Sequence, residues 1–101
     1  YELSRKRYQK SLTDFMIRPV YDRSFDKMAK RLPQKIRDKF RQRLGLFLEN
    51  KFNPILENHS VDPIYPGCRS INITGDFRAI FYQTGHTVTF IAIGTHPQLY
   101  K

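Results

Sequence analysis

Hydrophobic and polar positions alternate over three segments in the second half of the chain. Residues 70–74 and 77–82 alternate on either side of Gly75 and Asp76, and residues 87–93 alternate after a second turn signal. Alternation with a period of two is typical of strands with one buried face, and short connections join such strands into a meander. The pattern therefore predicts a three-stranded antiparallel sheet.

Apolar residues recur at helical spacing in two segments of the first half. Residues 25–32 follow Ser24, a residue type that caps helices, and residues 36–48 follow Pro33, which interrupts the pattern. A short connection between two amphipathic helices favours an antiparallel pair. The sequence therefore predicts a two-helix hairpin.

Residues 15–21, ahead of the helices, are rich in strand-forming residue types. Pro19 lies within them and cannot donate a ladder hydrogen bond, so this segment is predicted to be an edge strand. The fold class that follows is α+β: a strand, a two-helix hairpin and a three-stranded antiparallel meander, with the helices packed on one face of a small sheet. A chain of 101 residues, 40% of them hydrophobic, accommodates one such domain.

Charge is distributed unevenly along the chain. The net charge is +9, and residues 1–50 contain fourteen basic and six acidic side chains, whereas residues 51–101 contain four and three. A strongly basic small domain attracts polyanions, above all RNA and DNA. Lys35 and Lys39, on the polar side of the second predicted helix, are candidate RNA contacts.

Several classes of protein are excluded by what the sequence lacks. Cys68 is the only cysteine, no Cys/His cluster has the spacing of a zinc site, and no apolar run is long enough to span a membrane. No apolar segment follows the basic N-terminal residues, so they do not form a secretory signal. We expect a cytoplasmic protein with no metal and no cofactor.

Three segments resemble the RelE/ParE toxin superfamily, in its YafQ-like and RelE-like branch. They are Met16–Lys27 with the Leu-Pro break after it, the strand region Gly67–Phe81, and the ending Gly94-Thr95-His96 followed by Leu99 and Tyr100. Met16 falls where such toxins begin, so residues 1–15 are expected to be a basic N-terminal extension of a toxin domain spanning residues 16–101.

The resemblance implies a function. Toxins of this type are held inactive by a cognate antitoxin protein, and they cleave messenger RNA in the ribosomal A site, where ribosomal RNA is also contacted. Cleavage proceeds by attack of a ribose 2′-hydroxyl on the adjacent phosphodiester, without a metal. The reaction needs a base, an acid and cations that stabilise the phosphorane charge.

The resemblance also assigns candidate catalytic residues. His96 is the predicted general acid, because histidine exchanges protons near neutral pH. His59 and Asp76 are alternatives for the base or for the group that orients it. Arg69 and Arg78 are predicted to clamp phosphate, because a guanidinium offers forked donors and a permanent charge.

Further residues are candidates for RNA binding. Tyr100 and Phe77 are possible stacking surfaces for an unpaired base, although strand aromatics more often pack in a core. Asn72 is a third candidate, and it stands where the YafQ-like branch has a second histidine. Ala92 stands where that branch has an arginine, so this chain departs from the pattern at two positions.

Two alternatives remain open at this point. One is a ParE-like protein that inhibits DNA gyrase on the same fold, although such a protein has no evident need for His96. The other is an attenuated member of the family that binds RNA without cleaving it, which the departures at Asn72 and Ala92 allow.

Overall fold

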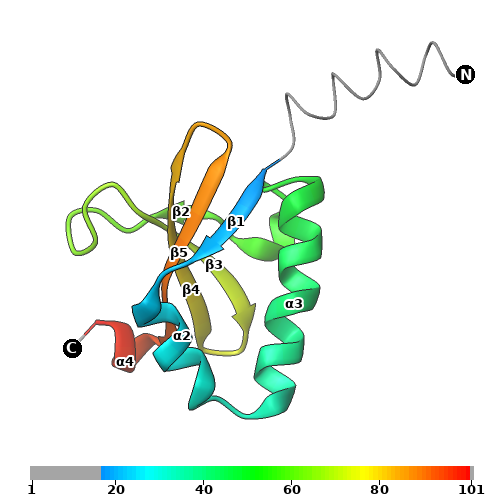
Figure 1. Ribbon diagram of the computed structural model, residues 1–101, viewed down its shortest axis with the longest axis vertical. Helices are drawn as coiled ribbons and strands as arrows, with labels where there is room; N and C mark the ends of the chain where they lie inside the picture. Colours follow the sequence, from blue (N-terminus) through cyan, green and yellow to red (C-terminus); the bar gives the residue numbers. More distant parts are fainter. Residues whose placement is uncertain (1–16, 101) are drawn as a thin grey trace, which may run out of the picture.

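The computed structural model describes residues 17–100, so the predicted extension, residues 1–15, lies outside the described residues. The order of elements confirms the predicted α+β class, with a 3-10 turn, a two-residue strand and a C-terminal helix in addition (Figure 1). The elements are β1 (Arg18–Tyr21), α2 (Arg23–Lys30), α3 (Gln34–Glu49), η1 (Pro54–Leu56), β2 (His59–Ser60), β3 (Arg69–Thr74), β4 (Phe77–Thr84), β5 (Thr87–Thr95) and α4 (His96–Leu99).

The five strands form one mixed sheet in the order β1-β5-β4-β3-β2. Strands β3, β4 and β5 form the predicted antiparallel meander. Strand β1 pairs in parallel with β5 at one edge of the sheet, which confirms the prediction from Pro19. The short strand β2 pairs with β3 at the other edge.

Helices α2 and α3 pack on one face of the sheet, as predicted (Figure 1). The main core between these helices and the sheet contains a cluster of aromatic rings around Phe90, which contacts five neighbouring rings at centroid distances from 5.3 to 6.0 Å. The buried residues of this main core are Phe25, Leu32, Ile36, Phe40, Phe47, Leu56, Ile71, Ile73, Ala79, Phe81, Val88, Phe90 and Ile93.

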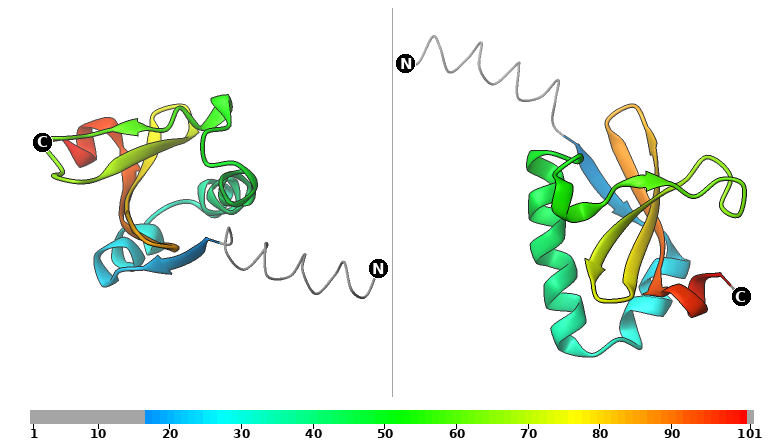
Figure 2. Two further views of the ribbon diagram at one scale, coloured as in Figure 1. Left: turned by 90° about the horizontal axis from the view of Figure 1, so that it is seen from above. Right: turned by 180° about the vertical axis from the view of Figure 1, so that it is seen from behind.

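A second, smaller core lies on the opposite face of the sheet, where the sequence predicted no cover. Helix α4 and the loop before β3 close over this face, so that α3 and α4 lie on opposite sides of the sheet (Figure 2). The buried members of the second core are Val61, Cys68, Ile80, Ala92 and Leu99. This second core positions the C-terminal residues. None of the helices within residues 17–100 is long and apolar enough to cross a membrane.

The N-terminal cap of α2 is Asp22 rather than the predicted Ser24. The Asp22 carboxylate accepts hydrogen bonds from the Ser24 backbone N–H at 3.1 Å and from its hydroxyl at 2.6 Å. The helix begins two residues earlier than predicted because aspartate is an equally good cap residue. The hydroxyl bond, followed by the backbone bond, lowers the pKa of Asp22.

We expect Asp22→Ala to lower the melting temperature at pH 7. The hydrogen bonds of the folded protein stabilise the ionised form of Asp22, which the unfolded chain does not. The gain in folding stability is present above the unfolded pKa, about 4, and is lost as pH falls through the lower folded pKa. Thermal unfolding followed by circular dichroism at pH 7 and at pH 2 measures the difference. An equal difference between variant and wild type at both pH values would contradict the account.

Candidate active site

His96 is the first residue of α4 and is exposed to solvent. Thr95 caps this helix in a capping box: Gln98 N–H donates to the Thr95 hydroxyl at 3.4 Å, and the Gln98 side chain accepts from Thr95 N–H at 2.8 Å. Gly94 makes room for this arrangement, because a Cβ at position 94 would lie 2.8 Å from the Gln98 Oε1 atom. The capping box therefore fixes the direction in which the chain leaves β5 at His96.

Asp76 lies beside His96 at the same end of the sheet. The backbone N–H of His96 donates to the carbonyl of Asp76 at 3.2 Å, and Phe77 pairs with Thr95. Asp76 is exposed in the turn after Gly75, whose φ of 52° is in the left-handed region. The structure thus brings together two of the predicted catalytic residues, one from each strand end.

The His96 imidazole lies against the ring of Tyr100, with ring centroids 4.6 Å apart. Tyr65 meets the Tyr100 ring edge-on at 5.8 Å, and its hydroxyl donates to the carbonyl of Leu99 at 2.7 Å. Burial raises the pKa of Tyr100, the Tyr65 phenol adds to the rise, and the charge of Arg78 opposes it. Tyr100 therefore stays protonated at neutral pH, within the electrostatic reach of Arg78.

Arg78 projects from β4 on the face that carries the second core. It pairs with Asn72 across β3 and with Gly94 across β5. Its Nη1 donates to the Asn72 Oδ1 atom at 2.9 Å and lies 3.8 Å from a carboxylate oxygen of Glu57. Within residues 17–100 its carboxylate partner is thus Glu57 rather than Asp76. One good bond to a neutral amide leaves most of the five guanidinium donors for a ligand.

His59 lies on this same face. It pairs with Ser70 in β3, and residues two apart in a strand share a face, so His59 and Asn72 project on one side of the sheet. The His59 Nδ1 atom is 2.7 Å from the carbonyl oxygen of Glu57. Since a carbonyl only accepts, Nδ1 is the donor in this contact, and Nε2 is the ring nitrogen that it leaves for a ligand.

Arg69 does not lie on this face, so the structure does not bring together the two arginines that were predicted to clamp phosphate. Arg69 pairs with Phe81, a residue of the main core, whereas Arg78 pairs with Asn72 on the other face. The two guanidinium groups therefore leave the sheet on opposite sides. Arg69 instead bonds to Asn58 and lies over the ring of Phe52.

Phe77 and the two lysines also lie away from the face with His96. Phe77 packs against the main core, so it is not an open stacking surface. Lys35 and Lys39 line a shallow pocket on α3 that ends at Thr74, two residues before Asp76. Phe77 therefore has the packing role that is common for strand aromatics, and the two lysines line a pocket with Thr74, at the end of β3.

Two residues next to this face were not predicted from the sequence. Tyr65 contacts Tyr100 from the loop before β3, and Glu57 contacts both Arg78 and His59 through its side chain and its carbonyl. Glu57 adopts a positive φ of 48°, which is uncommon for a residue with a side chain and turns the chain toward β2. Neither residue stands in a motif that would have indicated it.

His59, Asn72 and Arg78 therefore lie on the sheet face that carries the second core, and Asp76 and His96 lie together at one end of the sheet, with the Tyr100 ring against His96. They provide two imidazoles, a carboxylate and a guanidinium. Within residues 17–100 no three His, Cys, Asp or Glu side chains are grouped to hold a metal ion. Groups of these kinds are the ones that bind a phosphodiester and exchange protons with it.

No family model and no curated protein match this chain, but solved structures do. YafQ from Escherichia coli strain BL21(DE3) matches with a TM-score of 0.71 and 22% identity, over 85% of this chain and 100% of that one. The E. coli DinJ-YafQ toxin-antitoxin complex matches at 0.69 and 22%, over 85% and 99%. The RelB-RelE antitoxin-toxin complex from Methanococcus jannaschii matches at 0.61 and 18%, over 80% and 94%.

Proposed function

This chain has the fold of the RelE/ParE toxin superfamily, and we propose that it is the toxin of a type II toxin–antitoxin system. In this proposal it is an endoribonuclease that cleaves messenger RNA on the ribosome, in the cytoplasm and without a metal. The fold alone does not select this activity over gyrase inhibition. The proposal therefore rests on the side chains of the candidate site.

The single observation that carries the proposal is the position of Tyr100. Its ring contacts the His96 imidazole at 4.6 Å, and Arg78 pairs across the sheet with Gly94, two residues before His96. An imidazole and a cation thus come from neighbouring positions at the end of the sheet that holds Tyr100. An unpaired base stacked near Tyr100 would place its phosphate between His96 and Arg78, as the reaction requires.

In the proposed reaction the 2′-oxygen of a ribose attacks the adjacent phosphorus. The Nε2 atom of His59, or the Asp76 carboxylate, takes the proton of the 2′-hydroxyl. A bond forms between the 2′-oxygen and phosphorus, and the bond from phosphorus to the 5′-oxygen breaks. His96 gives its proton to that leaving oxygen, while Arg78 stabilises the equatorial oxygens. The products are a 2′,3′-cyclic phosphate and a free 5′-hydroxyl.

The two departures from the YafQ-like pattern define how this site would differ. Asn72 takes the place of a histidine, and its amide oxygen accepts from Arg78 at 2.9 Å, so it holds the guanidinium in position rather than transferring a proton. Ala92 is buried in the second core and contributes no charge. We propose that this site has one acid or base candidate and one cation fewer than the YafQ-like pattern, and we therefore expect slower cleavage.

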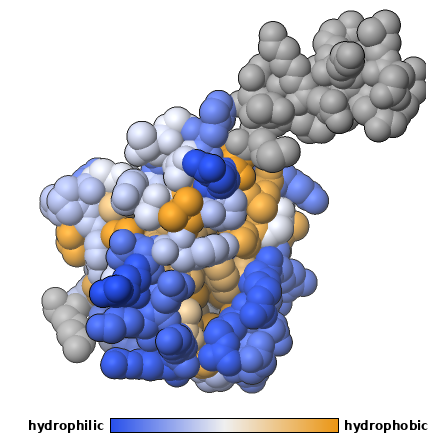
Figure 3. Space-filling view, in the orientation of Figure 1, coloured by the Kyte–Doolittle hydropathy of each residue, from blue (hydrophilic) through white to orange (hydrophobic). Residues whose placement is uncertain are grey.

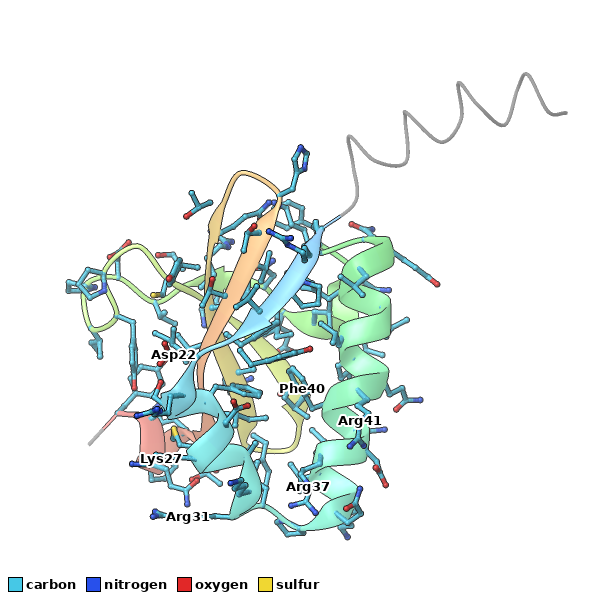
Figure 4. All side chains as sticks on the ribbon, viewed as in Figure 1. Asp22, Lys27, Arg31, Arg37, Phe40 and Arg41 are labelled. Carbon is cyan, nitrogen blue, oxygen red and sulfur yellow. The ribbon has the colours of Figure 1, made fainter. Side chains whose placement is uncertain are left out.

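The antitoxin would bind away from this face, over the two-helix hairpin. A groove between α2 and α3 exposes apolar side chains between polar flanks (Figure 3). Tyr21 and Leu44 are its accessible apolar residues, the buried rings of Phe25 and Phe40 lie beneath them, and Arg37 and Arg41 lie along its α3 side (Figure 4). An amphipathic segment with acidic residues fits an apolar groove bordered by cations. Similar toxins are solved in complex with DinJ and RelB.

A cell-free translation mix with a reporter messenger tests the proposed function. We expect the purified protein to cut the messenger when ribosomes are present and to leave it intact when they are absent. A supercoiling assay with DNA gyrase runs in parallel. Gyrase inhibition without cuts in the messenger would overturn the proposal in favour of a ParE-like activity, and binding of RNA with neither effect would indicate an inactive member.

A further inference from the structure

Phe52 is the most exposed aromatic side chain in residues 17–100. It follows α3 in the connection to η1, and 60% of its surface is accessible to solvent, compared with 40% for Tyr82 and 39% for Tyr21. A large apolar ring in water gains free energy from any partner that covers it. The proposed cleavage face does not account for Phe52.

Two cations hold fixed positions around this ring. Lys51 Nζ lies 5.4 Å from the ring centroid and donates to the Gln83 side chain at 2.8 Å. The Arg69 guanidinium lies 5.9 Å from the same centroid, and its Nε donates to the Asn58 side chain at 2.6 Å. Both anchors are neutral amides, and in the described part of the chain neither cation forms an ion pair with a carboxylate. Among residues 17–100, no carboxylate therefore neutralises these two positive charges.

We propose that Lys51, Phe52 and Arg69 form a second contact for single-stranded RNA, which we call the Phe52 platform. An unpaired base stacks on the exposed ring, and the phosphates beside it lie against the two cations. Nucleotides carry a flat apolar surface and an anion a few ångströms apart, which matches a ring with cations within 6 Å of its centre.

A protein partner fits this surface less well. A side chain that covered the ring would also remove two charges from water, and the cores of protein interfaces are depleted of lysine. RNA supplies the opposite charges together with the stacking surface. The net charge of +9 favours the same class of partner at long range.

The Phe52 platform lies apart from the cleavage face. Arg69 leaves the sheet on the side opposite to Arg78, so one RNA segment in contact with the His96 face would reach the platform only by passing around the β2 edge. The platform therefore binds RNA that is not the scissile segment. Its binding does not depend on the proposed cleavage.

A tryptophan at position 52 reports directly on the platform, because the chain contains no tryptophan. We expect Phe52→Trp to bind a twelve-residue 2′-O-methyl oligoadenylate and to lose tryptophan emission as a base stacks on the indole. The 2′-O-methyl groups prevent attack by the 2′-oxygen, so binding is measured whether or not the protein is a nuclease. Val20→Trp, on the β1 edge and 39% exposed, is the matched control and is expected to keep its emission.

Phe52→Ala tests the contribution of the ring to affinity. We expect its Kd for the same oligonucleotide, measured by fluorescence anisotropy, to rise about tenfold, as for other base–aromatic contacts. Lys51→Gln is expected to lower the slope of log Kd against log salt by about 0.7. Unchanged affinity in Phe52→Ala with unquenched Phe52→Trp would overturn the proposal. So would unchanged RNA affinity together with a change in self-association, which would identify the patch as a protein interface.

Discussion

Replacing His96 with glutamine is expected to slow messenger cleavage by about 10²- to 10⁴-fold, the usual contribution of a general acid or base. Glutamine retains a polar side chain of similar reach but cannot release a proton to the 5′-oxygen. The single-turnover rate constant on programmed ribosomes measures the effect. Because His96 is exposed and the cap of α4 comes from Thr95 and Gln98, the melting temperature should stay close to that of the wild type.

His86 provides a matched control for this variant. It is exposed in the turn before β5, whereas His96 follows the same nine-residue strand, so the two lie about 30 Å apart at 3.3 Å per residue. His86→Gln should cleave at the wild-type rate. Full activity of His96→Gln, or equal losses in both variants, would contradict general-acid chemistry at His96.

The second large effect is expected at Arg78 and should be absent at Arg69. Arg78→Gln removes the cation that faces the phosphorane, which costs about 10²- to 10³-fold, as loss of a transition-state donor does in other enzymes. Arg69→Gln removes the same charge from the opposite face and should leave the single-turnover rate constant within about threefold of the wild type.

A saturating concentration of each variant separates the rate of the chemical step from the affinity for the ribosome-bound messenger in this comparison. At saturation a loss of affinity, which the Phe52 platform predicts for Arg69→Gln, no longer changes the rate constant. The net charge falls equally in both variants, so a general effect of charge would slow both alike. Equal rate constants for the two variants would show that the face from which Arg78 projects is not the catalytic face.

The separation of the two arginines depends on one irregularity that the sequence does not reveal. Across the turn at Gly75 and Asp76, Thr74 pairs with Phe77, and a regular hairpin would then place Arg69 opposite Tyr82. Tyr82 and Arg78 are four residues apart in β4 and so point to the same face. Arg69 opposite Tyr82 would therefore share that face with Arg78. A bulge between Asn72 and Thr74 shifts the register by one residue, so that Arg69 pairs with Phe81 instead. A shift of one residue turns a side chain to the opposite face of the sheet.

The main elements of the fold were predictable because their patterns are long. The helical spacing over residues 36–48 and the alternation in residues 70–82 extend over several turns or residue pairs, so single exceptions do not obscure them. The cap at Asp22 was missed because Asp22 and Ser24 are equally good cap types, two positions apart. Only the hydrogen bond geometry distinguishes them.

The short elements of the site were not predictable from periodicity. Helix α4 has four residues and depends on the capping box of Thr95 and Gln98, and β2 has two residues. Such elements form because of tertiary contacts rather than local propensity. The family resemblance pointed to His96 and Tyr100, but the contacts of Tyr65 and Glu57 arise only once the chain has folded.

The chemistry of the cut ends tests the account most directly. A reporter messenger cleaved on ribosomes should carry a 2′,3′-cyclic phosphate on the upstream fragment and a 5′-hydroxyl on the downstream fragment. A messenger with a single 2′-deoxyribose at the cleaved nucleotide should stay intact at that position, because the attacking oxygen is missing. Cleavage at the 2′-deoxy position, or a 5′-phosphate on the downstream fragment, would mean that water attacks instead, and the roles assigned to His59, Arg78 and His96 would be wrong.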